Sequence, residues 1–477
     1  MKRRSGVLMH ISSLWGEYSC GAFGEECFEF IDFLAQSGFS VWQVLPFCVP
    51  DECNSPYKSY SAFSLNPFFI DLKTLNKQGL ITDSELAAAK QKSPYSCEFE
   101  RLKTERLSLL SKAASRFDDK AAISEFLKNH PNTADFCKFM ALKKVNNELS
   151  WNDWTEKTPD DNTLYLWQFT QYIFYTQWME IKKYANSKNI LIVGDIPIYV
   201  SHDSSDVWAN PKQFMLDEKN LPVCVAGVPP DYFCPDGQLW GNPLYDWDKM
   251  KDDDYSWWRA RLEFMNELFD GIRIDHFRGL DSYYAVSADE NTAKNGLWKK
   301  GPGMDFINVI KKVCSKKFII AEDLGDITED VEKLVKDSGF PGMCVLQFGF
   351  LGDSSSPHLP HNYKDNCVAY TGTHDNNTLL GYVWELDEIT RQRLFDYVDF
   401  SGDDWNSCYP KIIKMMLRSH ANTVIMPIQD LLFYGSDTRF NTPGKSDGNW
   451  AFRITKGQLD SINKQNFMDQ NILFGRV

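Results

Sequence analysis

The sequence predicts an α/β protein, a (β/α)8 TIM barrel with an inserted helical subdomain and an inserted irregular one. Three observations lead to this fold class. Short apolar or β-branched runs alternate with helical patterns along the chain, which is typical of βαβ units and a parallel sheet. About eight such runs occur, the number of strands in a closed barrel. The length of 477 residues suits one barrel that carries insertions.

The expected strands are short, and each ends in polar or small residues. They lie at 41–45, near 67–72, and at 190–193, 271–274, 318–321, 344–348, 368–370 and 424–426. Helical patterns separate them, most clearly at 25–36, 164–185 and 306–314. This order predicts that each strand is followed by a helix that covers the outside of the barrel.

Two intervals depart from the strand–helix repeat. Residues 75–160 are polar with helical periodicity, over a length too great for a loop. Residues 200–250 contain Pro, Gly, Asp and aromatic residues without periodicity. We therefore expect one catalytic barrel over 1–477, with a helical subdomain inserted at 75–160 and an ordered irregular lobe at 200–250.

Composition and charge exclude several classes of protein. With 43% hydrophobic and 14% aromatic residues, the chain is not intrinsically disordered. Acidic side chains outnumber basic ones by 65 to 51, and the net charge of −14 disfavours nucleic acid and anionic membranes as partners. No apolar run reaches 18 residues, and the first one is too broken for a signal peptide. We expect a cytoplasmic protein, and the twelve cysteines without a C-x-x-C pair fit a reducing compartment.

Several familiar nucleotide-binding, metal-binding and catalytic-serine motifs are missing from the sequence. It contains no G-x-G-x-x-G, H-E-x-x-H or G-x-S-x-G, and Arg439 stands where a P-loop ending at Ser446 needs its first glycine. His202, Asp203 and Asp206 are conceivable metal ligands, but a solvated loop explains them better. We expect no metal or organic cofactor.

Acidic residues end four of the expected strands, in the segments G-D-I-P, G-I-R-I-D-H, A-E-D-L-G and T-H-D-N. The residues concerned are Asp195, Arg273 with Asp275, Glu322, and His374 with Asp375. Barrel enzymes carry their reactive groups at the carboxyl ends of the strands. A single carboxylate in such a place can simply cap the next helix. Four of them together favour an active site.

Two of these carboxylates are expected to differ in ionisation. Arg273 and Asp275 are two residues apart, so on a strand they point to the same side, and the guanidinium favours ionised Asp275. Glu322 directly follows the apolar run FIIA, which favours a raised pKa and an acid role. Cleavage of a glycosidic bond needs such a pair. A purely structural Arg–Asp pair is the alternative for the first two residues.

Aromatic residues in irregular segments favour a sugar ligand. Tyr57 follows Ser55 and a proline, and Trp240 lies in the 200–250 lobe near Asp231, Gln238 and Asn242. Flat rings stack on pyranose faces, and the polar groups can bind hydroxyls. Each ring alone is more often a packing residue, but the concentration of such rings in the irregular lobe favours the sugar ligand.

At these residues the sequence resembles the amylomaltase family, the 4-α-glucanotransferases or disproportionating enzymes, which are relatives of the α-amylase superfamily. The resemblance runs over almost the whole chain. It is carried by the blocks WQVLPF, SPYKSYSAFSLNPFFIDL, GDIPIYVSHDSSDVW, AGVPPDYFCPDGQLWGNPLYDW, FDGIRIDHFRG, AEDLG and GTHDN.

The resemblance implies a role for each matching residue. Asp275 falls on the family's nucleophile, Glu322 on its acid/base and Asp375 on the carboxylate that holds the sugar in the transition state. The donor-subsite lining that it implies is Arg273, His276, His374 and Asp195, with Tyr57 as stacking ring and Ser55 nearby. The lobe with Asp231, Gln238, Trp240 and Asn242 resembles the family's substrate loop, and Asn441 in FNTPG also matches a substrate-binding position.

The expected function is transfer of α-1,4-glucan segments to the 4-hydroxyl of glucose or maltooligosaccharides, by retaining double displacement through a covalent glucosyl-Asp intermediate. Two alternatives stay open. A hydrolase of the same fold would use water in the second step, and a non-catalytic glucan-binding protein would keep only the fold. The three carboxylates speak against the second alternative.

Overall fold

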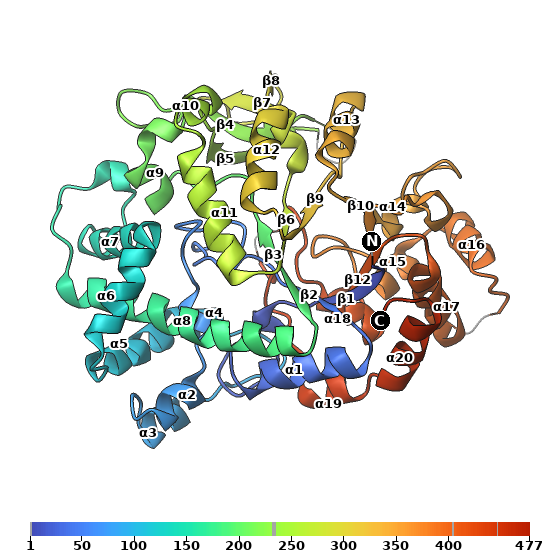
Figure 1. Ribbon diagram of the computed structural model, residues 1–477, viewed down its shortest axis with the longest axis horizontal. Helices are drawn as coiled ribbons and strands as arrows, with labels where there is room; N and C mark the ends of the chain where they lie inside the picture. The colour runs from blue at the N-terminus through green and yellow to red at the C-terminus, as the bar shows by residue number, and fades with distance from the viewer. Residues whose placement is uncertain (1, 231–234, 403–404, 446) are drawn as a thin grey trace.

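Eight parallel strands form the centre of the molecule (Figure 1). The computed structural model describes residues 2–230, 235–402, 405–445 and 447–477. In order around the sheet the strands are β10 (Gly342–Val345), β11 (Cys367–Tyr370), β12 (Thr423–Pro427), β1 (Arg4–Leu8), β2 (Val41–Gln43), β3 (Leu191–Ile196), β6 (Gly271–Ile274) and β9 (Phe318–Ala321). The amide of Ala321 donates to the carbonyl of Pro341 at 2.9 Å, which links β9 to the start of β10. The sheet is thus a nearly closed barrel, and the predicted (β/α)8 fold is confirmed.

Helices surround this barrel (Figure 1). The longer ones are α1 (Glu25–Gln36), α8 (Asp161–Ser187), α11 (Ser256–Leu268), α12 (Gly303–Val313), α13 (Glu329–Ser338), α15 (Leu379–Glu385), α16 (Glu388–Tyr397), α17 (Trp405–Arg418) and α20 (Lys464–Leu473). Short helices are α9 (Ser205–Ala209), α10 (Trp247–Asp252), α14 (Leu346–Gly349), α18 (Ile428–Leu431) and α19 (Lys456–Asp460). The three helices predicted most clearly, α1, α8 and α12, lie at or within three residues of their expected ends.

The predicted strand near 67–72 is wrong. Residues Pro67–Phe69 form a 3-10 turn, and α2 (Leu72–Lys77) follows directly. Pro67 has no amide hydrogen for a strand ladder, and the side chain of Asn66 accepts a hydrogen bond from the amide of Phe68, which starts the turn. The eighth strand is instead β1, near the N-terminus, between β12 and β2. The strand expected at 344–348 ends at Val345, where α14 begins.

The core between barrel and helices is strongly aromatic. Phe47 and Trp178 approach to 4.7 Å between ring centroids, as do Phe23 and Phe174. The indole of Trp178 on α8 also donates to the carbonyl of Leu268 at 2.9 Å. Edge-to-face pairs of this kind each contribute about 0.5–1.5 kcal/mol beyond burial. They fix α8 and α11 against the barrel, and so fix the strands that carry the site.

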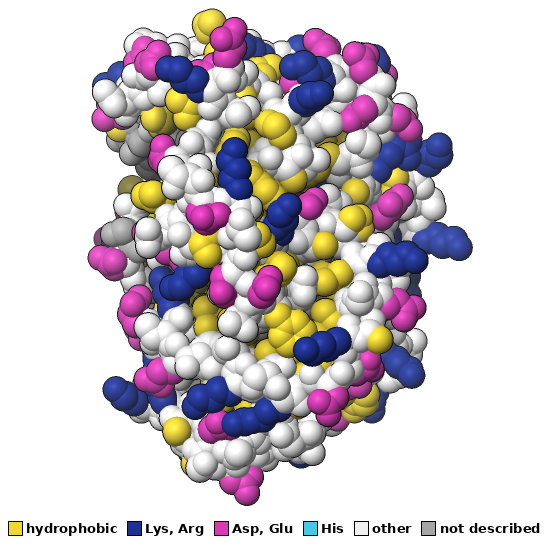
Figure 2. Space-filling view, turned by 90° about the vertical axis from the view of Figure 1, so that its left-hand side faces the viewer, with side chains coloured by type: hydrophobic (Ala, Val, Ile, Leu, Met, Phe, Trp, Pro, Cys, Tyr) yellow, Lys and Arg dark blue, Asp and Glu magenta, His cyan; other side chains and the backbone are white. Residues whose placement is uncertain are grey.

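Helices fill most of the 75–160 interval: α3 (Asp83–Ala88), α4 (Phe99–Arg101), a π-helical turn (Leu102–Arg106), α5 (Leu107–Ser115), α6 (Lys120–Asn129) and α7 (Pro131–Val145). Arg106 is buried and donates to the backbone carbonyls of Tyr18 and Phe68 at 2.6 and 3.1 Å. These bonds tie the helical segment to the loops around β1 and β2. On the side of the molecule formed largely by these helices, acidic and basic side chains are interspersed (Figure 2).

The 200–250 lobe has more regular structure than expected. It contributes β4 (Cys224–Val228) and β5 (Gln238–Pro243) to an antiparallel sheet with β7 (Ser282–Ser287) and β8 (Leu297–Lys300), in the order β5-β4-β7-β8. Sequence reasoning missed β5 because this edge strand is exposed or half-buried up to its last residue, Pro243, so it lacks an apolar alternation. Among the described residues, no helix is long and apolar enough to cross a membrane.

Candidate active site

The carboxyl ends of the barrel strands bring the predicted acidic residues together. Contacting residues come from five strands: Tyr57 after β2, Asp195 in β3, Arg273 and Asp275 at the end of β6, Glu322 after β9, and His374 and Asp375 after β11. Close packing behind β3 makes this possible. A Cβ at Gly194 would lie 2.3 Å from the ring of Phe269, so a side chain there would push Asp195 out of place.

Arg273 joins two of the carboxylates. It is paired with Asp195 across the β3–β6 register, and one guanidinium nitrogen donates to both Asp195 oxygens at 2.9 and 2.7 Å. Its other terminal nitrogen lies 2.7 Å from the Asp275 carboxylate. The prediction that Arg273 and Asp275 point to the same side is confirmed. Although burial opposes it, Asp195 and Asp275 raise the pKa of Arg273 well above its ordinary value, so the guanidinium stays charged.

Glu322 has a different environment from Asp275. It is 9% exposed, and its two oxygens accept hydrogen bonds from the amides of His276 at 2.6 Å and Leu324 at 2.9 Å. Burial raises the pKa of Glu322 to about 7, the charge of Asp275 acts in the same direction, and Arg273 opposes both. The raised pKa expected from the preceding apolar strand is confirmed. Burial and the charge of Asp275 thus outweigh Arg273, and a substantial fraction of Glu322 carries its proton near pH 7.

His374, Asp375 and Tyr57 form a second contact group. The ring of Tyr57 stacks on His374 with a centroid distance of 4.7 Å, and its hydroxyl donates to Asp195 at 2.8 Å. His374 Nε2 lies 3.2 Å from the Asp375 carboxylate, which also accepts a hydrogen bond from Asn441 at 2.6 Å. Although burial acts to raise it, His374 and Asn441 hold the pKa of Asp375 well below its ordinary value. Asp375 is therefore an ionised, partly exposed carboxylate beside the Arg273 pair.

The strand β5 brings an indole to the site. Trp240 contacts the His276 ring edge-to-face at 4.9 Å between centroids, and its Nε1 donates to Gln238 at 3.1 Å. Gln238 and Trp240 are two residues apart and lie on the same face of the strand. Tyr199, which sequence reasoning missed, lies 6.2 Å from Trp240 and 6.4 Å from His276 between ring centroids. The signal for it was in the sequence, because Tyr199 lies in the block GDIPIYV.

Three predicted substrate-binding residues are not seen in contact with the carboxylate cluster. Asn242 on β5 donates its side-chain amide to the carbonyl of Val200 at 2.9 Å, so part of its hydrogen-bonding capacity holds the lobe together. The Ser55 hydroxyl accepts a bond from the amide of Tyr57 at 3.3 Å and shapes that turn. Asp231 lies outside the described residues.

Two further residues that sequence reasoning missed support the β11 end. Trp450 is buried, and its ring lies 5.9 Å from the rings of both Tyr57 and His374. Arg439 donates to the backbone carbonyl of Asp375 at 2.8 Å. Both lie in the block FNTPGKSDGNWAFR around Asn441. Trp450 shows no periodic pattern that would mark it, and Arg439 was considered only as a departure from a P-loop.

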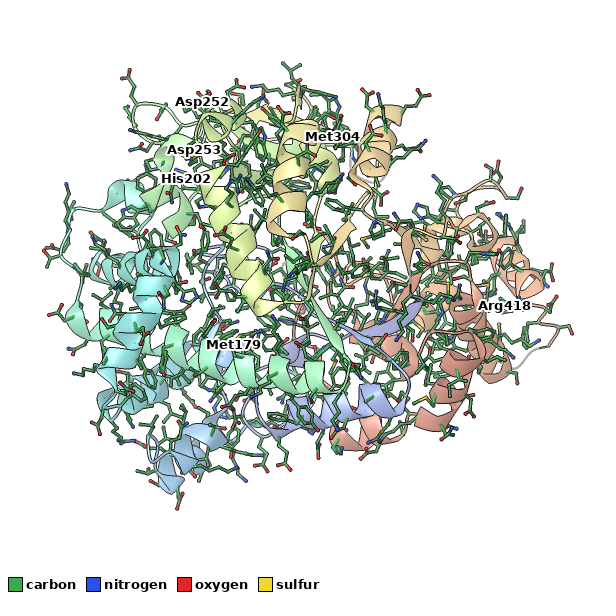
Figure 3. All side chains as sticks on the ribbon, viewed as in Figure 1. Met179, His202, Asp252, Asp253, Met304 and Arg418 are labelled. Carbon is green, nitrogen blue, oxygen red and sulfur yellow. The ribbon has the colours of Figure 1, made fainter. Side chains whose placement is uncertain are left out.

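The conceivable metal ligands near 202–206 have other partners. Asp203 lies 2.6 Å from the Nζ of Lys143, and Asp206 accepts a bond from the amide of Ala62 at 2.8 Å. His202 contacts a backbone carbonyl at 2.8 Å and lies toward the outside of the molecule (Figure 3). Among the described residues, no group of three or more His, Cys, Asp or Glu side chains is arranged to hold a metal ion.

Comparisons with known proteins agree with the sequence resemblance. Residues 9–459 match the protein family described as 4-alpha-glucanotransferase. A 4-alpha-glucanotransferase from Clostridium butyricum is 42% identical over 475 residues, covering 93% of this chain and 95% of the relative. An amylomaltase from Streptococcus agalactiae, solved in complex with acarbose, is 36% identical, with a TM-score of 0.95 and full coverage of both chains. An amylomaltase from Corynebacterium glutamicum shares the fold at 16% identity, with a TM-score of 0.79 over the whole of this chain and 75% of that one.

Proposed function

The chain belongs to the 4-α-glucanotransferase family and is a transfer enzyme, and we propose that it moves α-1,4-glucan segments between chains by retaining double displacement. The acceptor is the 4-hydroxyl of glucose or a maltooligosaccharide. We also infer that the chain is one catalytic barrel, with 75–160 and 200–250 as insertions. The observation that carries the proposal is the pair of unlike carboxylates: Asp275 held against a guanidinium, and Glu322 with a pKa raised to about 7.

In the first step, protonated Glu322 gives its proton to the glycosidic oxygen while an oxygen of Asp275 attacks the anomeric carbon. The bond from that carbon to the leaving oxygen breaks, and a glucosyl ester of Asp275 forms. Arg273 suits the nucleophile's role, because it keeps Asp275 ionised and fixes its direction. Near pH 7 a substantial fraction of Glu322 carries the proton that this step consumes.

In the second step, Glu322 is a carboxylate and takes the proton of the acceptor 4-hydroxyl. The acceptor oxygen attacks the anomeric carbon, and Asp275 leaves as a carboxylate, so the configuration is retained after two inversions. Ionised Asp375, held by His374 and Asn441, is positioned to bind sugar hydroxyls and to stabilise positive charge in the transition state. Tyr57, stacked on His374, presents its ring to the same space.

Water competes with a sugar acceptor in this second step, and the β5 lobe supports the preference for sugar. Trp240 packs against His276, which directly follows Asp275, so its indole borders the reacting carboxylates. An acceptor ring bound there has a high effective concentration relative to bulk water. Incubation with maltotriose tests the proposal. Longer maltooligosaccharides together with glucose indicate transfer, whereas shortening without elongation indicates hydrolysis.

A further inference from the structure

Two segments that are far apart in the sequence hold the carboxylate of Asp375. One is its own loop, residues 371–379, between β11 and the start of α15. The other is residues 438–441, in which Asn441 donates to the Asp375 carboxylate at 2.6 Å and Arg439 donates to its backbone carbonyl at 2.8 Å. Asp375 is therefore placed correctly only when both segments are fixed to the barrel.

A buried carboxyl group behind the site fixes the first segment. Asp430 lies in the short helix α18, directly after β12, and is fully buried. One of its oxygens accepts a hydrogen bond from the hydroxyl of Thr371 at 2.5 Å, and the other accepts from the amide of Leu379 at 2.8 Å. Thr371 and Leu379 are the two ends of the loop that carries Asp375. Asp430 thus closes this loop at its base.

The residue before Asp430 fixes the second segment. Gln429 is buried, and its side-chain amide donates to the carbonyl of Thr438 at 2.9 Å. Its backbone carbonyl accepts from the amide of Tyr434 at 3.0 Å. The hydroxyl of Tyr409 on α17 donates to the backbone carbonyl of Asp430 at 2.9 Å and holds α18 itself. Two neighbouring residues after β12 are thus bonded to both segments.

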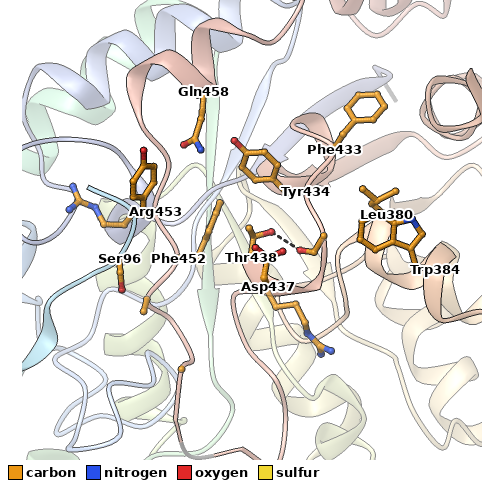
Figure 4. Close-up of a pocket in the computed structure, with 15 residues that line it drawn as sticks. Ser96, Leu380, Trp384, Phe433, Tyr434, Asp437, Thr438, Phe452, Arg453 and Gln458 are labelled. Atoms are coloured by element: carbon orange, nitrogen blue, oxygen red, sulfur yellow. Dashed lines mark hydrogen bonds between the residues drawn. The ribbon is translucent and has the colours of Figure 1, made fainter. Parts of the chain in front are cut away.

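The chain that leads into the second segment is packed on one side only. Residues 433–439 lie along a cavity of about 620 Å³ around Trp384 and Phe433 (Figure 4). Because side chains do not fill the space on that side, van der Waals contacts there are missing. The hydrogen bond from Gln429 to this chain segment is therefore important for its position.

Stability alone does not account for the carboxyl group of Asp430. Burial raises its pKa to about 7, although the hydrogen bonds from Thr371 and Leu379 act to lower it, and no Lys or Arg among the described residues contributes a compensating charge. An acid buried without a cation costs free energy that an apolar side chain of similar size does not. The two hydrogen bonds to the loop are the contribution that an apolar residue could not make.

We propose that Gln429 and Asp430 are positioning residues, which act on the reaction only through the placement of Asp375. This inference rests on the proposed function for the role of Asp375. That carboxylate is expected to interact more strongly with the transition state than with the bound substrate. Loss of its placement should therefore lower kcat and leave KM nearly unchanged.

The test is a double-mutant cycle. Thr371→Val removes the hydroxyl that is bonded to Asp430 and keeps the shape of the side chain. We expect kcat to fall about tenfold in the otherwise unmodified protein, but by less than about twofold in the Asp375→Asn background, where no placement of the carboxylate is left to lose. Fluoride release from α-maltosyl fluoride is measured, because a good leaving group keeps the rate of the Asp375→Asn protein measurable. Thr371→Ser keeps the hydroxyl and should restore kcat.

A matched control separates positioning from stability. Thr170 is buried on α8 and donates to the carbonyl of Trp167 at 2.9 Å, so Thr170→Val makes the same change and deletes a buried hydrogen bond away from the site. It should lower Tm about as much as Thr371→Val and leave kcat unchanged. Gln429→Met removes the bond to Thr438 instead, and its loss of kcat should depend on Asp375 in the same way.

A second readout does not depend on turnover. Although burial opposes it, Asp375 raises the pKa of His374 above its ordinary value, so displacement of Asp375 should lower that pKa. The chain has eight histidines, and after labelling with ¹³C the His374→Gln variant identifies the ring signal of His374. We expect the pKa of His374 to fall in Thr371→Val and in Gln429→Met, and to stay unchanged in Thr170→Val.

Two results would overturn the proposal. One is an equal loss of kcat with and without Asp375→Asn, because Thr371 would then act on stability or on other groups. The other is a pKa of His374 that is the same in both variants as in the unmodified protein. Failure of the proposed function looks different. In that case the unmodified protein makes no product ladder from maltotriose, and the titration of His374 still decides whether Gln429 and Asp430 position Asp375.

Discussion

Replacement of Glu322 by glutamine should abolish transfer and, at the same time, change how stability depends on pH. Glutamine has nearly the same shape, but its single oxygen can accept from only one of the amides of His276 and Leu324, which now donate to separate Glu322 oxygens at 2.6 and 2.9 Å. The bond lost to the other amide lowers the stability of the variant by an amount that does not depend on pH. Glutamine cannot exchange a proton with the leaving oxygen. We expect kcat to fall at least about a thousandfold, because both proton transfers of the double displacement are lost.

The pH effect follows from the raised pKa of Glu322, about 7 in the folded protein against an ordinary 4.5. The folded state holds this proton more tightly than the unfolded chain. The stabilisation is complete below pH 4.5, is lost progressively as pH rises, and is gone above about 7. The full difference is about 3 kcal/mol of unfolding free energy, of which about 2 to 3 kcal/mol falls between pH 5 and pH 8. Glutamine does not ionise, so the unfolding free energy of the variant does not fall between pH 5 and pH 8 for this reason.

Calorimetric melting of both proteins at pH 5 and pH 8 measures the effect. For a chain of 477 residues the entropy of unfolding is about 1 kcal/mol per degree, so the Tm of Glu322→Gln should gain about 2–3 °C relative to the unmodified protein between these pH values. Glu263→Gln, at an exposed position on α11, is the matched control for a Glu-to-Gln change outside the active site. In the unmodified protein, kcat/KM should fall as pH rises above about 7.

Two results would refute this reasoning. A Tm difference between Glu322→Gln and the unmodified protein that is the same at pH 5 and pH 8 would show that Glu322 is not held protonated by burial. Retention of a tenth of the normal rate by the variant would show that another group performs the proton transfer.

Three further predictions concern the neighbouring residues. Asp275→Asn should reduce turnover of maltotriose at least about a thousandfold while folding, followed by circular dichroism, is retained, because the nucleophile is removed and the shape is not; activity near normal would exclude the covalent route. Trp240→Ala should raise the ratio of glucose release to chain elongation from maltotriose, and an unchanged ratio with lower total activity would assign the ring to general positioning. Tyr57→Phe keeps the ring over His374 but removes the hydroxyl that donates to buried Asp195 at 2.8 Å. Its kcat/KM should fall about tenfold, the cost of one charge-assisted hydrogen bond, and Tyr57→Ala should lose more.

Sequence reasoning identified the barrel and most of its strands because parallel strands buried on both faces read as apolar runs. It also placed Arg273 beside Asp275, since the period of two along a strand determines this locally. It failed at residues 67–72, where a proline and a capping asparagine turn an apolar run into a 3-10 turn. The N-terminal strand β1 gains its place through pairing with β2 and with β12, and β12 lies near the other end of the chain.

The sequence by itself therefore determined the fold class, the acidic strand ends and the low-dielectric setting of Glu322, because these depend on residue type and on neighbours in the chain. Tertiary structure decided the side-chain contacts between segments that are far apart in the sequence. The stack of Tyr57 on His374, the support of both by Trp450, and the bond from Asn441 to Asp375 each join residues from different parts of the chain. The cavity around Trp384 and Phe433 likewise arises where α15 meets the segment after α18. Local periodicity carries no information about such contacts, since they form only when closure of the barrel brings the strand ends together.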